Sequence, residues 1–236
     1  MKKAFKIIGK GILGIIVLVL LLFAFVYFTY NEPLPKGVSG PEADALATKI
    51  LNAVQHEQYK NTRYLSWTFR DAHHYIWDKD QQKVEVSWDT VKVNLNLKEP
   101  KMSIVSVDGT KTTPENASKY IEKALAYFHN DSFWVVAPHK VFDKGVTRSI
   151  VSLEDNETGL LVTYKSGGTT PGDSYLWLLD KNYRPKAYKM WVSIIPIGGL
   201  YVTWDNWQPT KSGITLPTAH SMFILNIPIK DAKAWN

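Results

Sequence analysis

A charge-free apolar run near the start of the chain is the feature that most restricts what this sequence can fold into. No charged residue occurs between Gly11 and Asn31, and residues 12–28 are almost entirely isoleucine, leucine, valine, phenylalanine and tyrosine. An α-helix rises about 1.5 Å per residue, so about 20 apolar residues cross a hydrocarbon core about 30 Å thick. The run has this length and therefore predicts a membrane-spanning helix.

The residues around the run favour an uncleaved signal anchor, with a cleaved secretory signal as the alternative. A signal peptide has a shorter apolar core, of about 7–15 residues, and ends in small residues at its cleavage site. This run ends instead in bulky residues, from Phe25 to Tyr30. The first ten residues carry four lysines and no basic cluster follows the run directly, so the positive-inside rule places the N-terminus in the cytosol. The predicted anchor residues are Ile12, Leu18, Phe23, Tyr27 and Tyr30, with both tyrosines suited to a headgroup boundary.

The chain then divides into four parts. We expect a basic cytoplasmic segment at 1–10, a transmembrane signal anchor at 11–31, a linker at 32–40 and a single extracytoplasmic β-rich domain at 41–236. A linker of about ten residues reaches no more than about 35 Å. The domain is therefore expected close to its own membrane, on the periplasmic side of the inner membrane if the host is Gram-negative.

Charge and composition exclude several kinds of function. Four of the 28 basic residues precede the anchor and all 22 acidic residues follow it, so the outer domain carries only about +2. A nucleic-acid binder shows clustered basic residues, so we expect no nucleic-acid partner. The absence of cysteine excludes disulfides, thiolate metal sites and the acylated cysteine of a lipoprotein.

The sequence contains no recognisable catalytic motif. There is no H-E-x-x-H and no G-x-S-x-G, and the glycine-rich stretch 167–173 lacks the G-K-[ST] ending of a P-loop. We interpret that stretch as a turn. The expectation is a protein that is not an enzyme, with no catalytic residues, no metal and no cofactor.

Hydrophobic periodicity predicts the elements of the outer domain. Spacings of three and four predict helices over 42–59 and 114–128, and a short extended segment is expected at 131–138. Alternation predicts strands at 64–69, 73–77, 84–88, 91–97, 147–153, 160–165, 174–179, 186–195, 199–204 and 214–225. The alternation changes parity between Trp88 and Val91, which predicts a turn or bulge at Asp89 and Thr90. We therefore expect an α+β fold: an N-terminal transmembrane helix, then a curved antiparallel sheet forming an incomplete β-barrel closed by two helices.

The tryptophans suggest the candidate binding residues. Most of the nine fall on or beside predicted strands, where they either pack the core or line a concave cavity for an apolar ligand. The candidate ligand-binding residues are Trp67, Trp88, Trp177, Trp191 and Trp204.

The order of these segments resembles the bacterial lipoprotein-carrier superfamily, the LolA/LolB-like half-barrels. The resemblance rests on the layout from Pro41 to Pro228 and on aromatic segments such as Phe133-Trp134-Val135-Val136, Tyr175-Leu-Trp-Leu-Leu and Trp204-Asp-Asn-Trp. It implies an incomplete barrel closed by helices whose cavity binds lipid or acyl chains. This chain departs from that family in keeping a protein anchor and lacking the acylated cysteine, which argues against shuttling between membranes.

Two functions follow as expectations. The first is a membrane-anchored cell-envelope protein that binds a lipid or acylated ligand, such as a lipoprotein, in an aromatic-lined half-barrel. The alternative is a non-enzymatic structural or protein-interaction module with a packed core, no ligand and an envelope protein as partner. A third hypothesis is a hydrolase that uses a His/Asp pair, although no sequence motif supports it.

Overall fold

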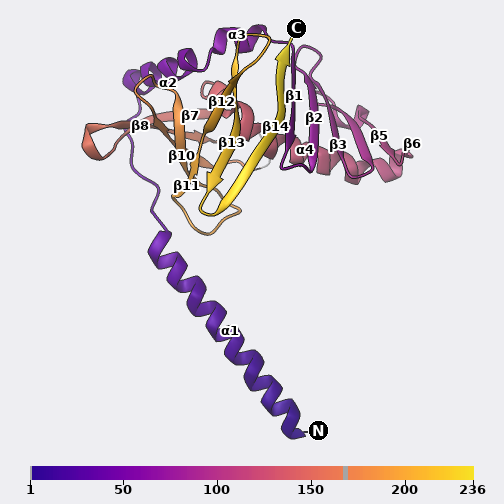
Figure 1. Ribbon diagram of the computed structural model, residues 1–236, viewed down its shortest axis with the longest axis vertical. Coiled ribbons are helices and arrows are strands. Elements are labelled where there is room, and N and C mark those ends of the chain that lie inside the picture. Colours follow the sequence, from indigo (N-terminus) through magenta and orange to yellow (C-terminus); the bar gives the residue numbers. More distant parts are fainter. Residues whose placement is uncertain (1, 167–169) are drawn as a thin grey trace.

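The computed structural model describes the backbone of residues 2–166 and 170–236 and the side chains of 8–113, 115–166 and 170–236. A long helix projects from one end of a sheet-rich domain (Figure 1). This helix, α1, runs from Lys2 to Tyr30, and its apolar part Ile8–Tyr30 is unburied and about 34 Å long at 1.5 Å per residue. Among the described helices it alone is long and apolar enough to cross a membrane.

Two antiparallel sheets form the domain. The larger has nine strands in the order β12-β13-β14-β1-β2-β3-β4-β5-β6, and the smaller has five in the order β11-β10-β9-β8-β7. The strands of the larger sheet are β1 Tyr64–Phe69, β2 His73–Asp78, β3 Lys83–Trp88, β4 Val91–Asn96, β5 Ile104–Val107, β6 Thr110–Lys111, β12 Asp205–Pro209, β13 Thr215–Met222 and β14 Leu225–Trp235. Those of the smaller sheet are β7 Val146–Ser152, β8 Thr158–Tyr164, β9 Ser174–Leu179, β10 Pro185–Trp191 and β11 Leu200–Thr203.

The alternating strands place one apolar face inward, as expected. In β3 and β4, Val84 lies opposite Leu95 and Val86 opposite Val93, and all four side chains are buried. The predicted turn between these strands is confirmed, and Asp89 holds a left-handed φ of 47° there. The parity change thus marks a hairpin and not a slip of register.

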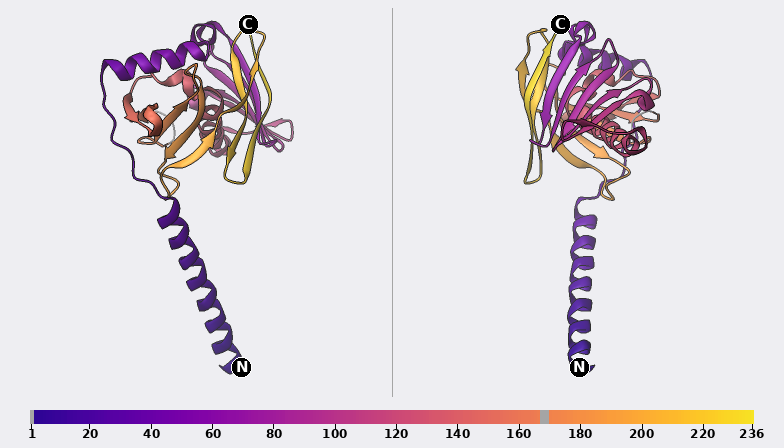
Figure 2. Two further views of the ribbon diagram at one scale, coloured as in Figure 1. Left: turned by 60° about the vertical axis from the view of Figure 1, so that its left-hand side comes forward. Right: turned by 90° about the vertical axis from the view of Figure 1, so that its right-hand side faces the viewer.

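Helices cover the concave faces and leave the sheets open at their edges (Figure 2). Helix α4, Pro114–Val136, packs against the larger sheet through Ala117, Ile121, Ala124 and Phe128. Helix α2, Pro41–Ala53, packs against the smaller sheet through Ala43, Leu46, Ala47 and Ile50. The short helix α3, His56–Asn61, follows α2, and short 3-10 turns lie at Pro100–Met102, Ala137–Lys140 and Glu154–Asn156. The expected α+β fold, a curved antiparallel sheet that does not close into a barrel, is confirmed.

The chain passes from one sheet to the other at Trp204. This residue lies between β11 of the smaller sheet and β12 of the larger one. The backbone N–H of Ser221 on β13 donates to the hydroxyl of Thr203, 2.8 Å away, which holds the two sheets together at this corner.

Four expected boundaries are wrong. The segment predicted as extended at 131–138 is the end of α4 and a 3-10 turn, because Val135 and Val136 are buried against the core as part of a helix. The predicted helix 42–59 divides into α2 and α3 at Gln55, whose φ of 55° no α-helix allows. The strand predicted at 186–195 ends at Trp191, and that at 214–225 ends at Met222, where a hairpin turn leads into the unpredicted β14. The turn predicted at 167–173 falls partly on 167–169, including the Gly167-Gly168 pair, which lies outside the described residues.

Candidate functional site

A group of seven aromatic residues fills the space between α4 and the smaller sheet. We call it the aromatic cluster: Phe133 and Trp134 on α4, Tyr175 and Trp177 on β9, Tyr188 on β10, Trp204 at the corner and Trp207 on β12. The Trp177 ring lies 5.4 Å from Tyr188 and 5.6 Å from Trp204, and Trp204 stacks on Trp207 at 5.7 Å, all between ring centroids. Offset and edge-to-face contacts at these distances are favourable.

The structure brings together two of the five candidate tryptophans. Trp177 and Trp204 are buried side by side in the aromatic cluster. Trp67 and Trp88 are buried on the larger sheet, where Trp67 stacks on Tyr75 and Trp88 meets Tyr127 edge-on. Trp191 lies elsewhere, on the end of β10, with its Nε1 donating to the backbone oxygen of Glu32 at 2.8 Å.

Buried donors without a partner are concentrated in the aromatic cluster. Among the described residues, Trp177 Nε1, Tyr188 Oη, Trp204 Nε1 and Trp207 Nε1 are buried and make no hydrogen bond within the protein. Trp67 and Trp77 carry two further such atoms in the core of the larger sheet. A buried donor without an acceptor costs about 1–3 kcal/mol and is rare in folded proteins. Four in one cluster therefore call for a functional explanation.

The best-formed pockets nonetheless lie away from the aromatic cluster. The two best-formed pockets along the described chain are both at the surface, with volumes of about 380 and 330 Å³. The larger lies at the start of α4, lined by residues such as Lys111, Thr113 and Tyr120, and the smaller lies between α2 and Tyr183. A ligand entering the aromatic cluster would have to displace side chains or move a helix.

His220 ties the aromatic cluster to both sheets and to α4. Its ring is fully buried on β13, with Nδ1 2.8 Å from the carbonyl oxygen of Thr203 and Nε2 2.8 Å from that of Trp134. The ring also meets Trp204 edge-on at 4.8 Å. Burial lowers the pKa of His220, while the two carbonyls act against that shift.

Replacing His220 with leucine is expected to destabilise the domain by about 2 kcal/mol, because a buried carbonyl loses the imidazole N–H that it accepts while the apolar volume is roughly kept. Chemical denaturation followed by tryptophan fluorescence measures this loss. His74→Leu is the matched control, because that ring is exposed on β2 and makes a single hydrogen bond, to Thr68 Oγ1 at 3.0 Å, so the loss should be about 1 kcal/mol or less. Equal effects of the two substitutions would contradict a tying role for His220.

A buried carboxylate forms the second polar centre. Asp131 on α4 accepts hydrogen bonds from Tyr75 Oη at 2.6 Å, His73 Nδ1 at 2.7 Å and Asn130 Nδ2 at 2.8 Å. A histidine held by a carboxylate is half of a hydrolase triad. Within the described residues, however, no serine or threonine hydroxyl hydrogen-bonds to His73. Sequence reasoning missed this centre because Asp131 fell in a segment predicted as extended.

A third polar group lies at the opposite end of the larger sheet, near the C-terminus. His139 stacks on Tyr59 at 4.0 Å, and His56 Nδ1 lies 3.4 Å from His139 Nδ1. Lys79 Nζ lies 3.9 Å from the Tyr59 ring centroid and donates to the carbonyl oxygens of Tyr59 and Thr62. Burial lowers the pKa of Lys79 to about 8 and lowers that of His139 as well.

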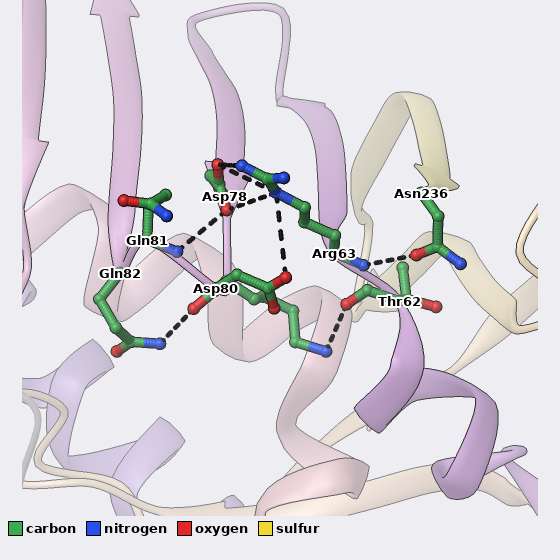
Figure 3. Close-up of polar contacts among 8 residues, drawn as sticks. Thr62, Arg63, Asp78, Asp80, Gln81, Gln82 and Asn236 are labelled. Atoms are coloured by element: carbon green, nitrogen blue, oxygen red, sulfur yellow. Dashed lines mark hydrogen bonds and ion pairs between the residues drawn. The ribbon is translucent and has the colours of Figure 1, made fainter.

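The hairpin beside this group is held by ion pairs (Figure 3). Arg63 binds Asp78 through Nε and Nη2, the closest contact being 2.9 Å, and its backbone N–H donates to Asn236 Oδ1 at 2.8 Å. These contacts fix the C-terminus beside β1. No group of three or more metal-ligating side chains occurs in the part of the chain that the structure describes.

No protein-family model, no curated protein and no solved structure matches this chain.

Proposed function

We propose that α1 remains attached as a signal anchor, with the N-terminus in the cytosol and the domain outside. The lysines before the apolar run and the bulky residues at its end support this orientation and the lack of cleavage. The contact of the Tyr30 ring with Phe223 adds to it, because cleavage after the apolar run would remove a ring that packs against the domain.

We propose further that the domain binds a lipid or acylated ligand through the aromatic cluster, without catalysing a reaction on it. The observation that carries this proposal is the set of four buried donors without acceptors. An ester or amide carbonyl of an acylated molecule supplies the missing acceptors, and the aromatic faces suit its hydrocarbon chain. The resemblance to the lipoprotein-carrier half-barrels agrees with this ligand class, with the anchor confining the protein to one membrane.

A packed-core interaction module is the second candidate. It is favoured by the two best-formed pockets, which lie at the surface and not at the aromatic cluster. In that function the aromatic cluster only stabilises the fold, and an envelope protein is recognised by an outer surface.

Photo-crosslinking separates the two candidates. The full chain is placed in vesicles that contain a phospholipid with a photoactivatable acyl chain, and labelled peptides are identified by mass spectrometry. We expect adducts on β9 and β12, and a several-fold loss of them in the Trp177→Phe/Trp204→Phe variant, which removes two donors and keeps aromatic rings.

Trp67→Phe is the matched control, because it removes an unpaired buried donor from the larger sheet instead. It should leave the labelling of β9 and β12 unchanged. Adducts confined to α1 and surface loops would contradict the lipid-binding proposal and favour the interaction module.

A further inference from the structure

The link between α1 and the domain is fixed in place. Directly after α1, Glu32 donates its backbone N–H to the carbonyl of Gly198 at 3.0 Å, and Asn31 Oδ1 accepts from the N–H of Gly198 at 2.8 Å. The carboxylate of Glu32 pairs with Lys189 Nζ at 2.7 Å, and its carbonyl accepts from Trp191 Nε1. The end of the helix therefore has a defined position against the loop between β10 and β11.

Two glycines make this close approach possible. A Cβ on Gly198 would lie 2.4 Å from the Trp191 ring and 2.8 Å from the Glu32 carbonyl oxygen. Gly199 has a φ of 79°, in the left-handed region, and a Cβ there would lie 2.6 Å from that of Glu32. Any larger residue at either position would push the chain after α1 away from the domain.

Exposed apolar side chains gather at the loops next to this link. We call them the membrane-facing loops: residues 192–199 between β10 and β11, and residues 222–225 at the β13–β14 turn. Their exposed fractions are 69% for Ile194, 66% for Phe223, 98% for Ile224 and 52% for Leu225.

The β13–β14 turn consists of apolar residues that are unusual in a solvent-exposed turn. Met222 pairs with Leu225, so Phe223 and Ile224 form a two-residue turn, and Phe223 holds a left-handed φ of 53°. Glycine is usual at such a position, and turns in water are otherwise made of asparagine, aspartate or serine. A phenylalanine and an isoleucine here cost backbone strain and leave apolar surface in water, unless something apolar covers them.

The position of α1 identifies what covers them. The Tyr30 ring meets the Phe223 ring edge-on at 5.7 Å between centroids. Residues 11–30 carry no charge and span about 30 Å as a helix, so Tyr30 lies at the boundary between acyl chains and headgroups. Both membrane-facing loops point toward the α1 side of the domain in each view (Figures 1 and 2). The same lipid boundary that surrounds Tyr30 is therefore within reach of the turn.

We infer that the membrane-facing loops insert into the lipid surface around α1 and seat the domain on the bilayer in one orientation. This inference rests on the proposed anchoring role of α1. The loops contact lipid in it, and not a partner protein. This loop–lipid contact, which we call the seat, adds to the anchor. The helix keeps the chain at the membrane, and the loops determine which side of the domain faces the bilayer.

Single-cysteine fluorescence tests the seat, and the natural absence of cysteine gives a clean background. Ile194→Cys, Ile224→Cys and Tyr183→Cys variants of the full chain carry an environment-sensitive fluorophore in phosphatidylcholine–phosphatidylglycerol vesicles. Tyr183 is the control, because it is exposed beside Lys49 on α2. Helix α2 lies on the far side of the domain from α1 (Figure 1). Spin-labelled lipids should remove most of the fluorescence at 194 and 224 and little at 183.

A turn exchange separates packing from membrane contact. The double substitution Phe223→Gly/Ile224→Ser gives a turn sequence that is better suited to water. It should leave the free energy of unfolding unchanged or raise it. It should nevertheless reduce the quenching of the probe at Ile194 severalfold if the turn holds the domain on the lipid.

The outcomes are distinguishable. A chain that stays in the vesicles after an alkaline wash, but whose probes at 194 and 224 are quenched no more than that at 183, overturns the seat and leaves the anchor standing. A chain that washes off overturns both. Because the vesicles hold no other protein, loops that need a protein partner would also give the unquenched result.

Discussion

Replacing Asp131 with alanine is expected to destabilise the domain by about 1–3 kcal/mol, a substantial part of the roughly 5–15 kcal/mol that holds a typical domain folded. The carboxylate is buried and is the acceptor for Tyr75 Oη and His73 Nδ1, which together join β2 to α4. Its loss leaves the buried Tyr75 hydroxyl without that acceptor and opens a gap beside the helix. The shift of the denaturant midpoint, with the slope of the transition unchanged, measures the effect.

A double-mutant cycle with Tyr75→Phe separates the hydrogen bond from general loss of packing. If the bond carries much of the effect, the double variant should lose clearly less stability than the sum of the two single variants. Asp143→Ala is the control, because its carboxylate is half-exposed and pairs with Lys140 at the surface. Additive single effects, or an equal loss at Asp143, would show that the Asp131 network does not hold α4 to the sheet.

Much of the outer fold follows from patterns that local physics enforces. Apolar and polar residues alternate regularly in β3 and β4 because one face of these strands is buried and the other faces solvent. The change of parity between them marks their hairpin. The apolar run of α1 is predictable for a similar reason, since its length and lack of charge are set by the bilayer.

Tertiary packing overrides local preference where prediction fails. Phe133, Trp134, Val135 and Val136 favour a strand by residue type, yet they extend α4 because helical spacing brings them against both cores. Strand β14 contains Pro228 and pairs on both sides, which a sequence pattern argues against. Its register against β1 shifts near Asp231, whose φ is 52°, so no regular alternation marks it.

The candidate site was only partly accessible from the sequence. Trp177 lies on β9 and Trp204 directly after β11, both inside strands that the sequence pattern predicts, but their meeting depends on the corner between the sheets. Trp191 points instead to the chain after α1, a contact between residues 159 apart. Unpaired donors are a property of three-dimensional packing, and no pattern of residue types reveals them.

Raising the pH above about 10 is expected to unfold the domain steeply. Burial raises the pKa of five tyrosines, namely Tyr59, Tyr75, Tyr164, Tyr175 and Tyr188. Above the ordinary tyrosine pKa of about 10 the unfolded chain releases protons that the folded chain retains, so stability falls as pH rises. Each such tyrosine contributes a slope of up to about 1.4 kcal/mol per pH unit, and five together exceed a typical domain's stability within about two pH units. Tyrosinate absorbance and near-ultraviolet circular dichroism, followed together, should show the buried tyrosines ionising in one step with loss of structure.

Tyr188→Phe tests the cause of this alkaline transition. The Tyr188 hydroxyl is buried without a partner, so its removal should leave stability at neutral pH unchanged or raise it by about 1 kcal/mol. It should also reduce the alkaline slope by up to about 1.4 kcal/mol per pH unit, because one proton fewer is held by the fold. Tyr201→Phe is the control, since that ring is exposed on β11 and should not move the transition. If the tyrosines instead ionised gradually near pH 10 while the fold stayed intact, their rings would be in contact with water, and the aromatic cluster would be open rather than filled.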